Sequence, residues 1–349
     1  MTGRKILSVI ASVALVAAMT PVLTGCGTTS GSEGTGSGQT TAAESDGELT
    51  TVRFAIMTSN IDHYYAIVGQ QTGIFEEHGL DVELTEFAAG VNTVDAITTG
   101  QADIGMLADY ALVNRFGNTA EATDLDIIAR FAYSTGDASY LYVNPDTVSS
   151  LSDLAGQAII TLPGTVWDYW TGLTIEAAGL TTDEVEVLEV DSAQSALAVM
   201  TSGEGVAFWA SGVNGDKLEE AGMVPLMTLQ DLATSTDQYF ISSDSFMTEN
   251  AEVATAFLEA IADIEAYIQA DGSDAASIVA DELGIEQDEA QSTIDAVTLT
   301  LDFTQGTLEH LEDIQEWALE NGSFTEAYDT TEFLSLDVLR ALYPDAVEV

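Results

Sequence analysis

Short apolar segments alternate with helical stretches through most of this 349-residue chain, and this alternation limits its fold more than any other feature. In a first series, strand-like segments at residues 51–57, 80–84, 102–107 and 125–129 are separated by segments of helical character. Strands separated by helices of this length imply right-handed β-α-β crossovers. The sequence therefore predicts an α/β fold with a parallel-rich sheet covered by helices on both faces.

A second series with the same pattern begins near residue 157. Strands are expected at residues 158–161, 185–188 and 206–209, and helices at residues 166–178 and 193–200. In each series a helix ends in a similar turn before its strand, Thr-Thr-Gly-Gln at 98–101 and Thr-Ser-Gly-Glu at 201–204. Glycine at that place can adopt the left-handed backbone that closes a helix. The repetition predicts two similar α/β lobes.

The only cysteine, Cys26, follows an apolar stretch at about residues 6–22, which is preceded by Arg4 and Lys5. A positive start, an apolar stretch and small residues are the parts of a secretory signal. The Leu-Thr-Gly-Cys run at residues 23–26 resembles the lipobox of bacterial lipoproteins, which implies that Cys26 is lipidated and begins the mature chain. The alternatives are a plain signal peptide or a membrane helix with an incidental cysteine.

The residues after Cys26 have the composition of a linker. Residues 27–48 are almost entirely Gly, Ser, Thr, Ala and acidic residues, without apolar periodicity. We expect a signal peptide at 1–25, a disordered lipid-anchored tether at 26–48, and a folded part from 49 onwards. Because Cys26 has no second thiol to pair with, no disulfide can form within the chain.

The charge balance is strongly acidic, with 58 acidic residues against seven basic ones and a formal net charge of −51. Removal of the signal also takes away Arg4 and Lys5. Such a surface repels phosphate backbones and anionic headgroups, which excludes nucleic acid as a partner and leaves membrane association to the lipid on Cys26. It also leaves few cationic side chains to hold an anion.

Five motifs carry a family resemblance, and they are spread over both series. They lie at residues 62–66 (Asp-His-Tyr-Tyr-Ala), 73–83 (Gly-Ile-Phe-Glu-Glu-His-Gly-Leu-Asp-Val-Glu), 100–105 (Gly-Gln-Ala-Asp-Ile-Gly), 154–156 and 162–165. With them the chain resembles the periplasmic-type solute-binding proteins of ABC transporters. The nearest subgroup is the NMT1-like one, whose members bind taurine, aliphatic sulfonates, nitrate and thiamine pyrimidine precursors.

The resemblance implies a periplasmic-binding-protein type II fold. Two doubly wound α/β lobes would be joined by two crossing strands, with a helical C-terminal part on lobe one. Lobe one is expected at residues 49–143 and 238–349, and lobe two at residues 144–237. The candidates for the crossing strands are residues 140–143 and 239–241.

A long helix is expected at residues 251–269, inside the C-terminal part. It carries Phe257, Ile261, Ile264 and Ile268 at helical spacing. We interpret it as core that packs on lobe one.

Ligands of open parallel sheets bind outside the carboxyl ends of strands, beside helix N-termini. In this chain those places are residues 59–65, 89–92, 108–110 and 164–169. The candidate ligand-binding residues there, and at the end of one lobe-two strand, are Asn60, Asp62, His63, Tyr64, Gly90, Asp109, Tyr110, Thr165, Trp167, Asp168 and Trp209. Their aromatic rings and carboxylates suit a planar, nitrogen-containing ligand.

Structural roles compete with ligand binding at these positions. Asp62, Asp109 and Asp168 can equally serve as helix caps, and His63 as a hydrogen-bonded loop residue. One of Trp167 and its neighbour three residues later is expected to pack into lobe two. Helix N-termini and hydroxyl groups can also hold a sulfonate or nitrate without any Arg or Lys, although nearby carboxylates would oppose an anion.

The resemblance implies an extracytoplasmic solute-binding lipoprotein of an ABC importer, anchored to the cell membrane. It would be a monomer without a cofactor, which delivers its solute to a permease that a separate ATPase drives. A thiamine-precursor-like aromatic solute ranks first, and a sulfonate or nitrate second.

An enzyme of thiamine pyrimidine synthesis is disfavoured because Lys217 is the mature chain's only lysine and no cysteine-rich motif exists. The three histidines show no metal-ligand spacing. A purely structural surface protein is a third interpretation.

Overall fold

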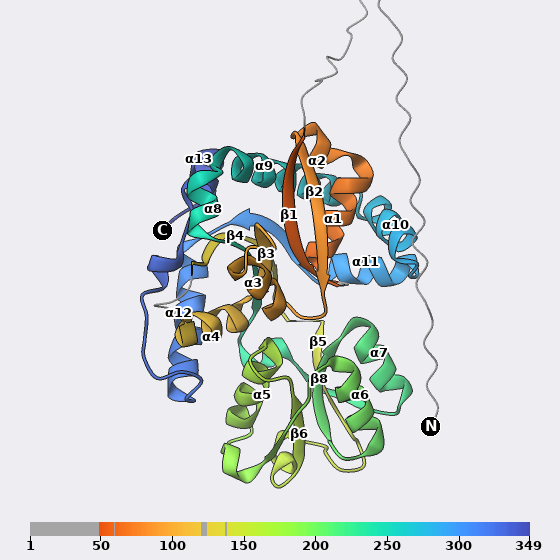
Figure 1. The fold of residues 1–349 in the computed structure, drawn as a ribbon. Coiled ribbons are helices and arrows are strands. Elements are labelled where there is room, and N and C mark those ends of the chain that lie inside the picture. The colour runs from red at the N-terminus through yellow and green to blue at the C-terminus, as the bar shows by residue number, and fades with distance from the viewer. Residues whose placement is uncertain (1–48, 59, 120–123, 137) are drawn as a thin grey trace, which may run out of the picture. The chain divides into compact units, whose positions relative to one another are not determined.

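Two β-sheets with helices packed around them make up the described part of the chain (Figure 1). The computed structural model describes residues 49–58, 60–119, 124–136 and 138–349. The predicted signal peptide, Cys26 and the predicted tether lie outside the described residues. Among the helices of the described ranges, none is both long and apolar enough to cross a bilayer.

Sheet one has six strands in the order β11-β4-β10-β3-β1-β2. The strands are β1 (Thr50–Met57), β2 (Leu80–Phe87), β3 (Ile104–Ala108), β4 (Asp126–Ser134), β10 (Thr236–Ser242) and β11 (Thr298–Asp302). β1 pairs in parallel with β2 and β3, whereas β10 runs antiparallel to both β3 and β4, and β11 antiparallel to β4. The sheet is therefore parallel only in the half made by β1, β2 and β3.

Helices from both ends of the chain surround sheet one, and together with it they form lobe one. They are α1 (Ile61–Thr72), α2 (Ile74–Glu77), α3 (Val91–Thr98), α4 (Asp109–Thr119), α8 (Asp244–Glu249), α9 (Ala251–Ala270), α10 (Gly272–Leu283), α11 (Gln287–Asp295), α12 (Gln305–Glu320) and α13 (Asp337–Leu342). The expected long helix is α9, and it buries Phe257, Ile261, Ile264 and Ile268 as predicted. Phe257 packs edge-on against Phe54 of β1, with ring centroids 5.3 Å apart.

Lobe two is built on a five-stranded sheet in the order β7-β6-β8-β5-β9. Its strands are β5 (Ser139–Val143), β6 (Ala158–Thr161), β7 (Glu186–Glu189), β8 (Ala207–Ser211) and β9 (Val224–Thr228), and its helices are α5 (Val166–Ala177), α6 (Ala193–Ser202) and α7 (Gly212–Glu220). β6 pairs in parallel with β7 and β8, as the second series predicted.

The chain passes between the sheets twice, a few residues earlier than the expected boundaries. β5 pairs with β8 and β9 in sheet two, and β10 pairs with β3 and β4 in sheet one. The expected crossing strands 140–143 and 239–241 therefore each lie within one sheet, and the passes fall between β4 and β5 and between the 3-10 helix Leu229–Leu232 and β10. At the first pass, Gly136 has a φ of +78°, and a Cβ there would lie 2.5 Å from a Leu229 carbon. Both observations require glycine at this position.

Candidate functional site

The four places predicted from the sequence are helix starts that follow the ends of parallel strands. α1, α3 and α4 follow β1, β2 and β3 in lobe one, and α5 follows β6 in lobe two. Two of these starts meet across the lobes, because Tyr110 of α4 stacks on Tyr169 of α5 with centroids 5.4 Å apart and planes 5° apart. Residue 59 lies outside the described ranges.

At the start of α1, Asp62 closes the turn that follows β1. Its carboxylate accepts hydrogen bonds from the Met57 N–H at 2.7 Å and from Asn60 Nδ2 at 2.8 Å. The side chain is fully buried, and burial raises the pKa of Asp62 to about 7. Asn60 Nδ2 also donates to Gln238 Oε1 of β10 at 2.8 Å. Asp62 therefore has a structural role in the turn, and Asn60 links α1 to the strand that follows the second crossing.

The other candidates near α1 and α3 pack inside lobe one. His63 is 3% exposed, and burial lowers its pKa. Tyr64 is 1% exposed, and its hydroxyl donates to Thr293 Oγ1 of α11 at 3.4 Å. Gly90 precedes α3 with an ordinary φ of −57°, and a Cβ there would come within 3.2 Å of Leu107. Close packing on β3 is therefore what favours glycine at this position.

Asp109 begins α4 and joins it to the second crossing. Its Oδ1 accepts from the Tyr110 N–H at 2.7 Å, and its Oδ2 accepts from the Asp237 N–H at 2.8 Å. His310 Nε2 of α12 lies 2.9 Å from the same Oδ2. Burial alone would lower the pKa of His310, but the hydrogen bond and charge of Asp109 raise it. The carboxylate therefore ties together three elements of lobe one.

The contacts of Asp109 continue into a group of buried and half-buried charged side chains that we call the hinge network: Asp109, Arg130, Asp237, Asp302 and His310. Arg130 of β4 donates from Nη1 to Asp237 Oδ2 at 3.0 Å, and from Nε to Asp302 Oδ1 at 2.8 Å. Burial raises the pKa of Asp237, while the charges of His310 and Arg130 oppose that rise. Only Asp109 of this network was predicted. The sequence signal for the other members is Arg130, a charged residue inside an apolar strand, because a buried charge needs partners of opposite charge.

In lobe two, the turn before α5 is closed by its own side chains. Thr165 Oγ1 donates to the Leu162 carbonyl at 2.7 Å, and Asp168 accepts from the Gly164 N–H at 3.1 Å. Burial raises the pKa of Asp168, and the charge of Glu189 adds to the rise. Negative charge is therefore unfavourable at this helix start, whereas a positively charged or N–H-bearing group beside Asp168 would be stabilised.

Trp167 lies in the first turn of α5 and is half-buried. Its ring stacks on Phe208 with centroids 6.2 Å apart and meets Trp170 edge-on at 6.4 Å. It packs against two hydrophobic clusters, the large one that extends through both lobes and the smaller one of lobe two. Trp170, in contrast, is 7% exposed and packs on Trp209, as expected for one of the pair.

Trp209 differs from the expectation that it faces the cleft. The side chain is fully buried in β8, and its Nε1 donates to Thr174 Oγ1 of α5 at 2.9 Å. Both the ring and the N–H are occupied inside lobe two, so Trp209 presents no surface at the strand end.

Buried polar atoms without a hydrogen-bond partner gather around α5. Six such side-chain atoms occur among the described residues, and four of them come from the end of β6 and the first turns of α5. We call these four the α5 polar group: Thr161 Oγ1, Trp167 Nε1, Trp170 Nε1 and Thr171 Oγ1. Buried polar groups in proteins normally have partners, so this concentration marks α5 as the part of the fold with unused hydrogen-bonding capacity.

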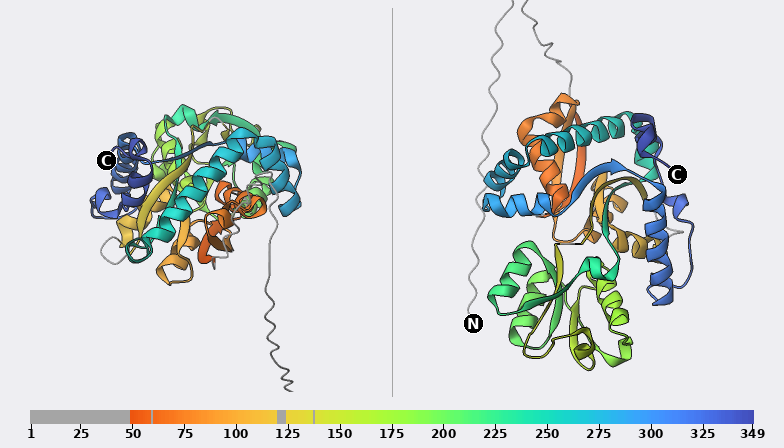
Figure 2. Two further views of the ribbon diagram at one scale, coloured as in Figure 1. Left: turned by 90° about the horizontal axis from the view of Figure 1, so that it is seen from above. Right: turned by 180° about the vertical axis from the view of Figure 1, so that it is seen from behind.

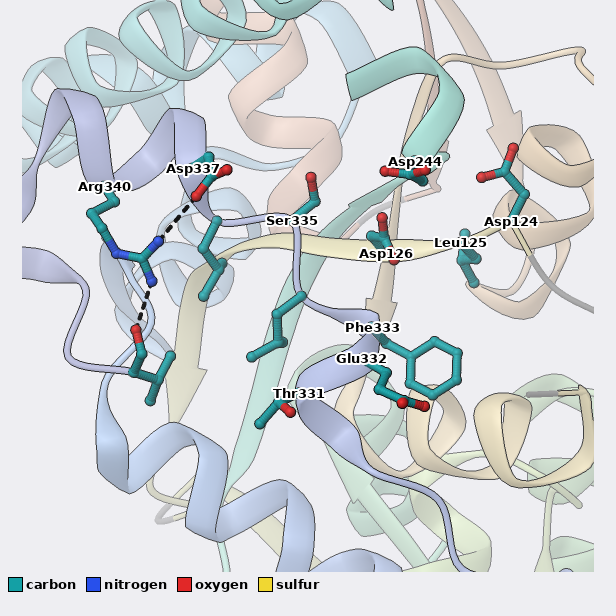
Figure 3. A pocket seen from close by; sticks show the side chains of 13 residues that line it. Asp124, Leu125, Asp126, Asp244, Thr331, Glu332, Phe333, Ser335, Asp337 and Arg340 are labelled. Carbon is teal, nitrogen blue, oxygen red and sulfur yellow. Dashed lines mark hydrogen bonds and ion pairs between the residues drawn. The ribbon is translucent and has the colours of Figure 1, made fainter. Parts of the chain in front are cut away.

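A hollow in lobe one lies away from these helix starts (Figure 3). Its volume is about 760 Å³, and none of the predicted site residues lines it. Burial and the charges of Asp244 and Asp124 raise the pKa of Asp126 there to about 6. Its only arginine, Arg340, is held by Asp337 and by the Val349 carbonyl. In the described part of the chain, no group of three or more His, Cys, Asp or Glu residues is arranged to hold a metal ion.

Comparison with known proteins places this geometry in a family. The model of the family described as "NMT1/THI5 like" matches residues 60–275, which include every candidate residue from Asn60 to Trp209. The chain belongs to the NMT1/THI5-like family. Among curated proteins, the chain is similar to a Brucella abortus protein named as a binding protein, which is 23% identical over 223 residues, 63% of this chain and 67% of that protein.

Solved structures similar to this NMT1/THI5-like protein show its fold. The aliphatic sulphonate binding protein SsuA of Escherichia coli has a TM-score of 0.69 at 15% identity, covering 81% of this chain and 91% of that one. SsuA of Xanthomonas axonopodis, bound to MOPS, has a TM-score of 0.68 at 14% identity and covers 82% and 99%. The desulfurization enzyme DSZB has a TM-score of 0.63 at 14% identity and covers 85% and 99%. The fold is therefore that of the periplasmic binding proteins, as predicted, and it serves both binders and an enzyme.

Proposed function

We propose that this protein is an extracytoplasmic solute-binding lipoprotein of an ABC importer. It captures a small nitrogen-containing aromatic solute, such as a thiamine pyrimidine precursor, between its two lobes and delivers it to a permease. Membership of the NMT1/THI5-like family and the two-lobed fold support the solute-binding class. The lipid on Cys26 would keep the binder at the membrane.

The observation that carries the choice of solute is the pair formed by Trp167 and Asp168. A half-buried indole offers a ring edge and face for an aromatic solute, and the neighbouring carboxylate lies where negative charge is already unfavourable. An amino group or protonated ring nitrogen beside Asp168 would relieve that cost. The arginines Arg53, Arg115 and Arg130 are all paired with aspartates, so none of them offers a free cation to an anionic solute.

A sulfonate or nitrate is the second candidate, and the α5 polar group favours it. Indole N–H groups and hydroxyls can donate to sulfonate oxygens without a cationic residue. The similar SsuA structures are of proteins that bind sulfonates. The charge beside Asp168 opposes this candidate and keeps it second.

An enzymatic role ranks below both binding roles. DSZB shows that the fold can carry catalysis. Pyridoxal-phosphate chemistry of the thiamine-pyrimidine type needs a lysine, and Lys217, on α7, is exposed among acidic neighbours. No catalytic step is required by the proposed mechanism, because contacts from both lobes favour a closed state that the permease recognises.

A thermal-shift screen of the full chain tests the choice of solute. The panel contains thiamine pyrimidine precursors, polyamines, taurine, alkanesulfonates and nitrate. A true ligand raises the unfolding temperature with concentration, because it binds the folded state only. We expect the pyrimidine precursors to give the largest shift. A shift with sulfonates alone would reverse the ranking, and turnover of any solute would overturn the binding role.

A further inference from the structure

Helix α12 belongs to the C-terminal part of lobe one, and its second half reaches lobe two. Along one face it buries Leu308, Leu311 and Ile314 in lobe one. Figure 2 shows α12, in blue, running along the side of lobe one towards the green helices of lobe two. Trp317 lies on another face of the helix and is not part of that buried stripe.

Trp317 contacts α5 of lobe two through both its ring and its N–H. Its Nε1 donates to Glu176 Oε1 at 2.8 Å, and its ring meets Tyr169 edge-on with centroids 4.9 Å apart. Asn321, one turn later in the chain, adds a bond to the same Glu176 oxygen at 3.4 Å. The contact is therefore directional as well as apolar.

The two helices approach closely because α5 has no side chain at the meeting point. A Cβ at Gly172 would lie 2.3 Å from Trp317 Cζ2, which no packed structure tolerates. Glycine inside a helix costs roughly 0.5–1 kcal/mol of stability relative to alanine. Gly172 is therefore a position where α5 gives up helix stability and gains a close approach to α12.

A second contact lies beside the first and adjoins a crossing segment. Tyr110 of α4 stacks on Tyr169 and also meets Trp317 edge-on at 5.9 Å. The Tyr110 hydroxyl lies 3.0 Å from Ser323 Oγ, just after α12. The Tyr169 hydroxyl lies beside Thr234 in the second crossing. Three rings from two lobes thus meet on one side of the crossings.

We propose that Trp317 is a strap that holds the two lobes together before any solute arrives. α12 moves with lobe one and α5 with lobe two, so opening of the lobes must separate Trp317 from Gly172 and Glu176. The strap therefore raises the fraction of molecules in the closed arrangement. Solute binds most tightly when contacts from both lobes are available, so the strap also raises the apparent affinity.

The effect on lobe opening is independent of the proposed solute, and only the effect on affinity rests on the proposed function. The test uses the full chain with Cys26→Ser, so that spin labels react only at introduced cysteines. Labels at position 252 on α9 and position 224 on β9, both exposed, report the distance between the lobes by electron–electron double resonance. No solute is added in this first measurement.

Two substitutions, one in each lobe, disrupt the contact between Trp317 and Gly172. Trp317→Ala removes the ring, and Gly172→Ala pushes a methyl group against it. Each is expected to lengthen and broaden the distance distribution. The double variant should be no more open than Trp317→Ala alone, because the added methyl group then has room. Its α5 should also be more stable than in the Trp317→Ala single variant.

Glu316→Ala is the matched control, since Glu316 is the exposed neighbour of Trp317 on α12. Circular-dichroism melts show whether each variant is folded. The strap is ruled out if folded Trp317→Ala and Gly172→Ala variants keep the parental distance distribution, or if the double variant is additively more open.

Affinity for a thiamine pyrimidine precursor and for taurine is then measured by calorimetry. Trp317→Ala should weaken whichever binds by about tenfold, the size expected for one charged hydrogen bond with its aromatic contact. If neither probe binds the parent chain, the proposed solute class fails while the distance result stands. If a probe binds Trp317→Ala as tightly as the parent, the coupling of strap to affinity is refuted.

Discussion

The two lobes differ in how far their buried polar side chains have hydrogen-bond partners. In lobe one, the hinge network satisfies Asp109 and Asp237 with partners from α4, α12, β4 and β10. In lobe two, the α5 polar group leaves four buried atoms without a protein partner. Among the described residues, lobe one has two such atoms far apart in the chain, Arg115 Nε and Thr236 Oγ1, whereas the four of lobe two are gathered at the end of β6 and in the first turns of α5. This difference supports the proposal that the solute binds at α5 of lobe two, with lobe one as the scaffold.

The largest expected effect is in lobe one. Arg130→Ala leaves Asp237, which is 3% exposed, and Asp302 without their cation. Breaking a buried pair from one side costs about 3–5 kcal/mol of unfolding free energy. Urea unfolding measures the loss.

The matched control for Arg130 is Arg115→Ala. Arg115 pairs with Asp95, whose side chain is 62% exposed, so this change should cost at most about 1 kcal/mol. Similar losses in the two variants would mean that the hinge network is no more important than a surface ion pair.

The next effect concerns binding in lobe two. Trp167→Ala should weaken solute binding by about 2 kcal/mol, roughly thirtyfold, because a half-buried aromatic ring at a binding site contributes strongly. Calorimetry with the solute found by thermal shift provides the value. Trp209→Phe is the control, since it loses the bond to Thr174 inside the lobe and should lower stability without changing affinity. An unchanged affinity of Trp167→Ala would remove that residue from the site.

A smaller effect is the difference in unfolding free energy between valine substitutions at two threonines of α5. Thr174→Val removes the acceptor of Trp209 Nε1, which leaves that buried N–H unpaired and should cost about 1–2 kcal/mol of unfolding free energy. Thr171→Val removes a hydroxyl that belongs to the α5 polar group, and should change the unfolding free energy by less than about 0.5 kcal/mol. Equal losses in urea unfolding would contradict the contrast between paired and unpaired groups.

A further prediction is a dependence of stability on pH. Because burial raises the pKa of Asp62 from 3.8 to about 7, the folded state holds this proton more tightly than the unfolded chain does. Its contribution to stability is fully present below pH 3.8 and is lost as the pH rises through about 7. Asp62→Asn should therefore flatten the fall in unfolding free energy over this range.

Part of that slope should remain in Asp62→Asn, because burial also raises the pKa of Glu265 to about 7. Melting curves from pH 4 to pH 8 compare the parent and the variant. A steeper fall in Asp62→Asn would show that the folded state does not favour the proton on Asp62.

Local sequence pattern was enough to locate most elements of the fold. The strand at 158–161 is β6, and the helix starts at Val166 and Ala193 are where the apolar periodicity placed them. Gly100 and Gly203, the glycines of the repeated turn, have φ values of +69° and +78°, as the helix-closing conformation requires. These features depend on neighbours in the chain.

Features that depend on distant partners were not predicted. The pattern at Tyr140–Val143 is the same whichever sheet it joins, and only its pairing with β8 and β9 places it in lobe two. Trp209 was a site candidate because it ends a strand, but Thr174, 35 residues earlier, occupies its N–H. His310 reaches Asp109 across 201 residues, and no spacing rule connects them.

The position of β10 has a consequence for how the domain is made. Among the described strands, β4 pairs with β10 and β11 alone, and both follow lobe two in the chain. During synthesis, lobe two can complete its whole sheet from residues 139–228 while β4 has no partner in its own sheet. An apolar strand without partners is a template for wrong pairing. The sheet of lobe two is thus finished first, and the sheet of lobe one is completed only when β10 and β11 have been made.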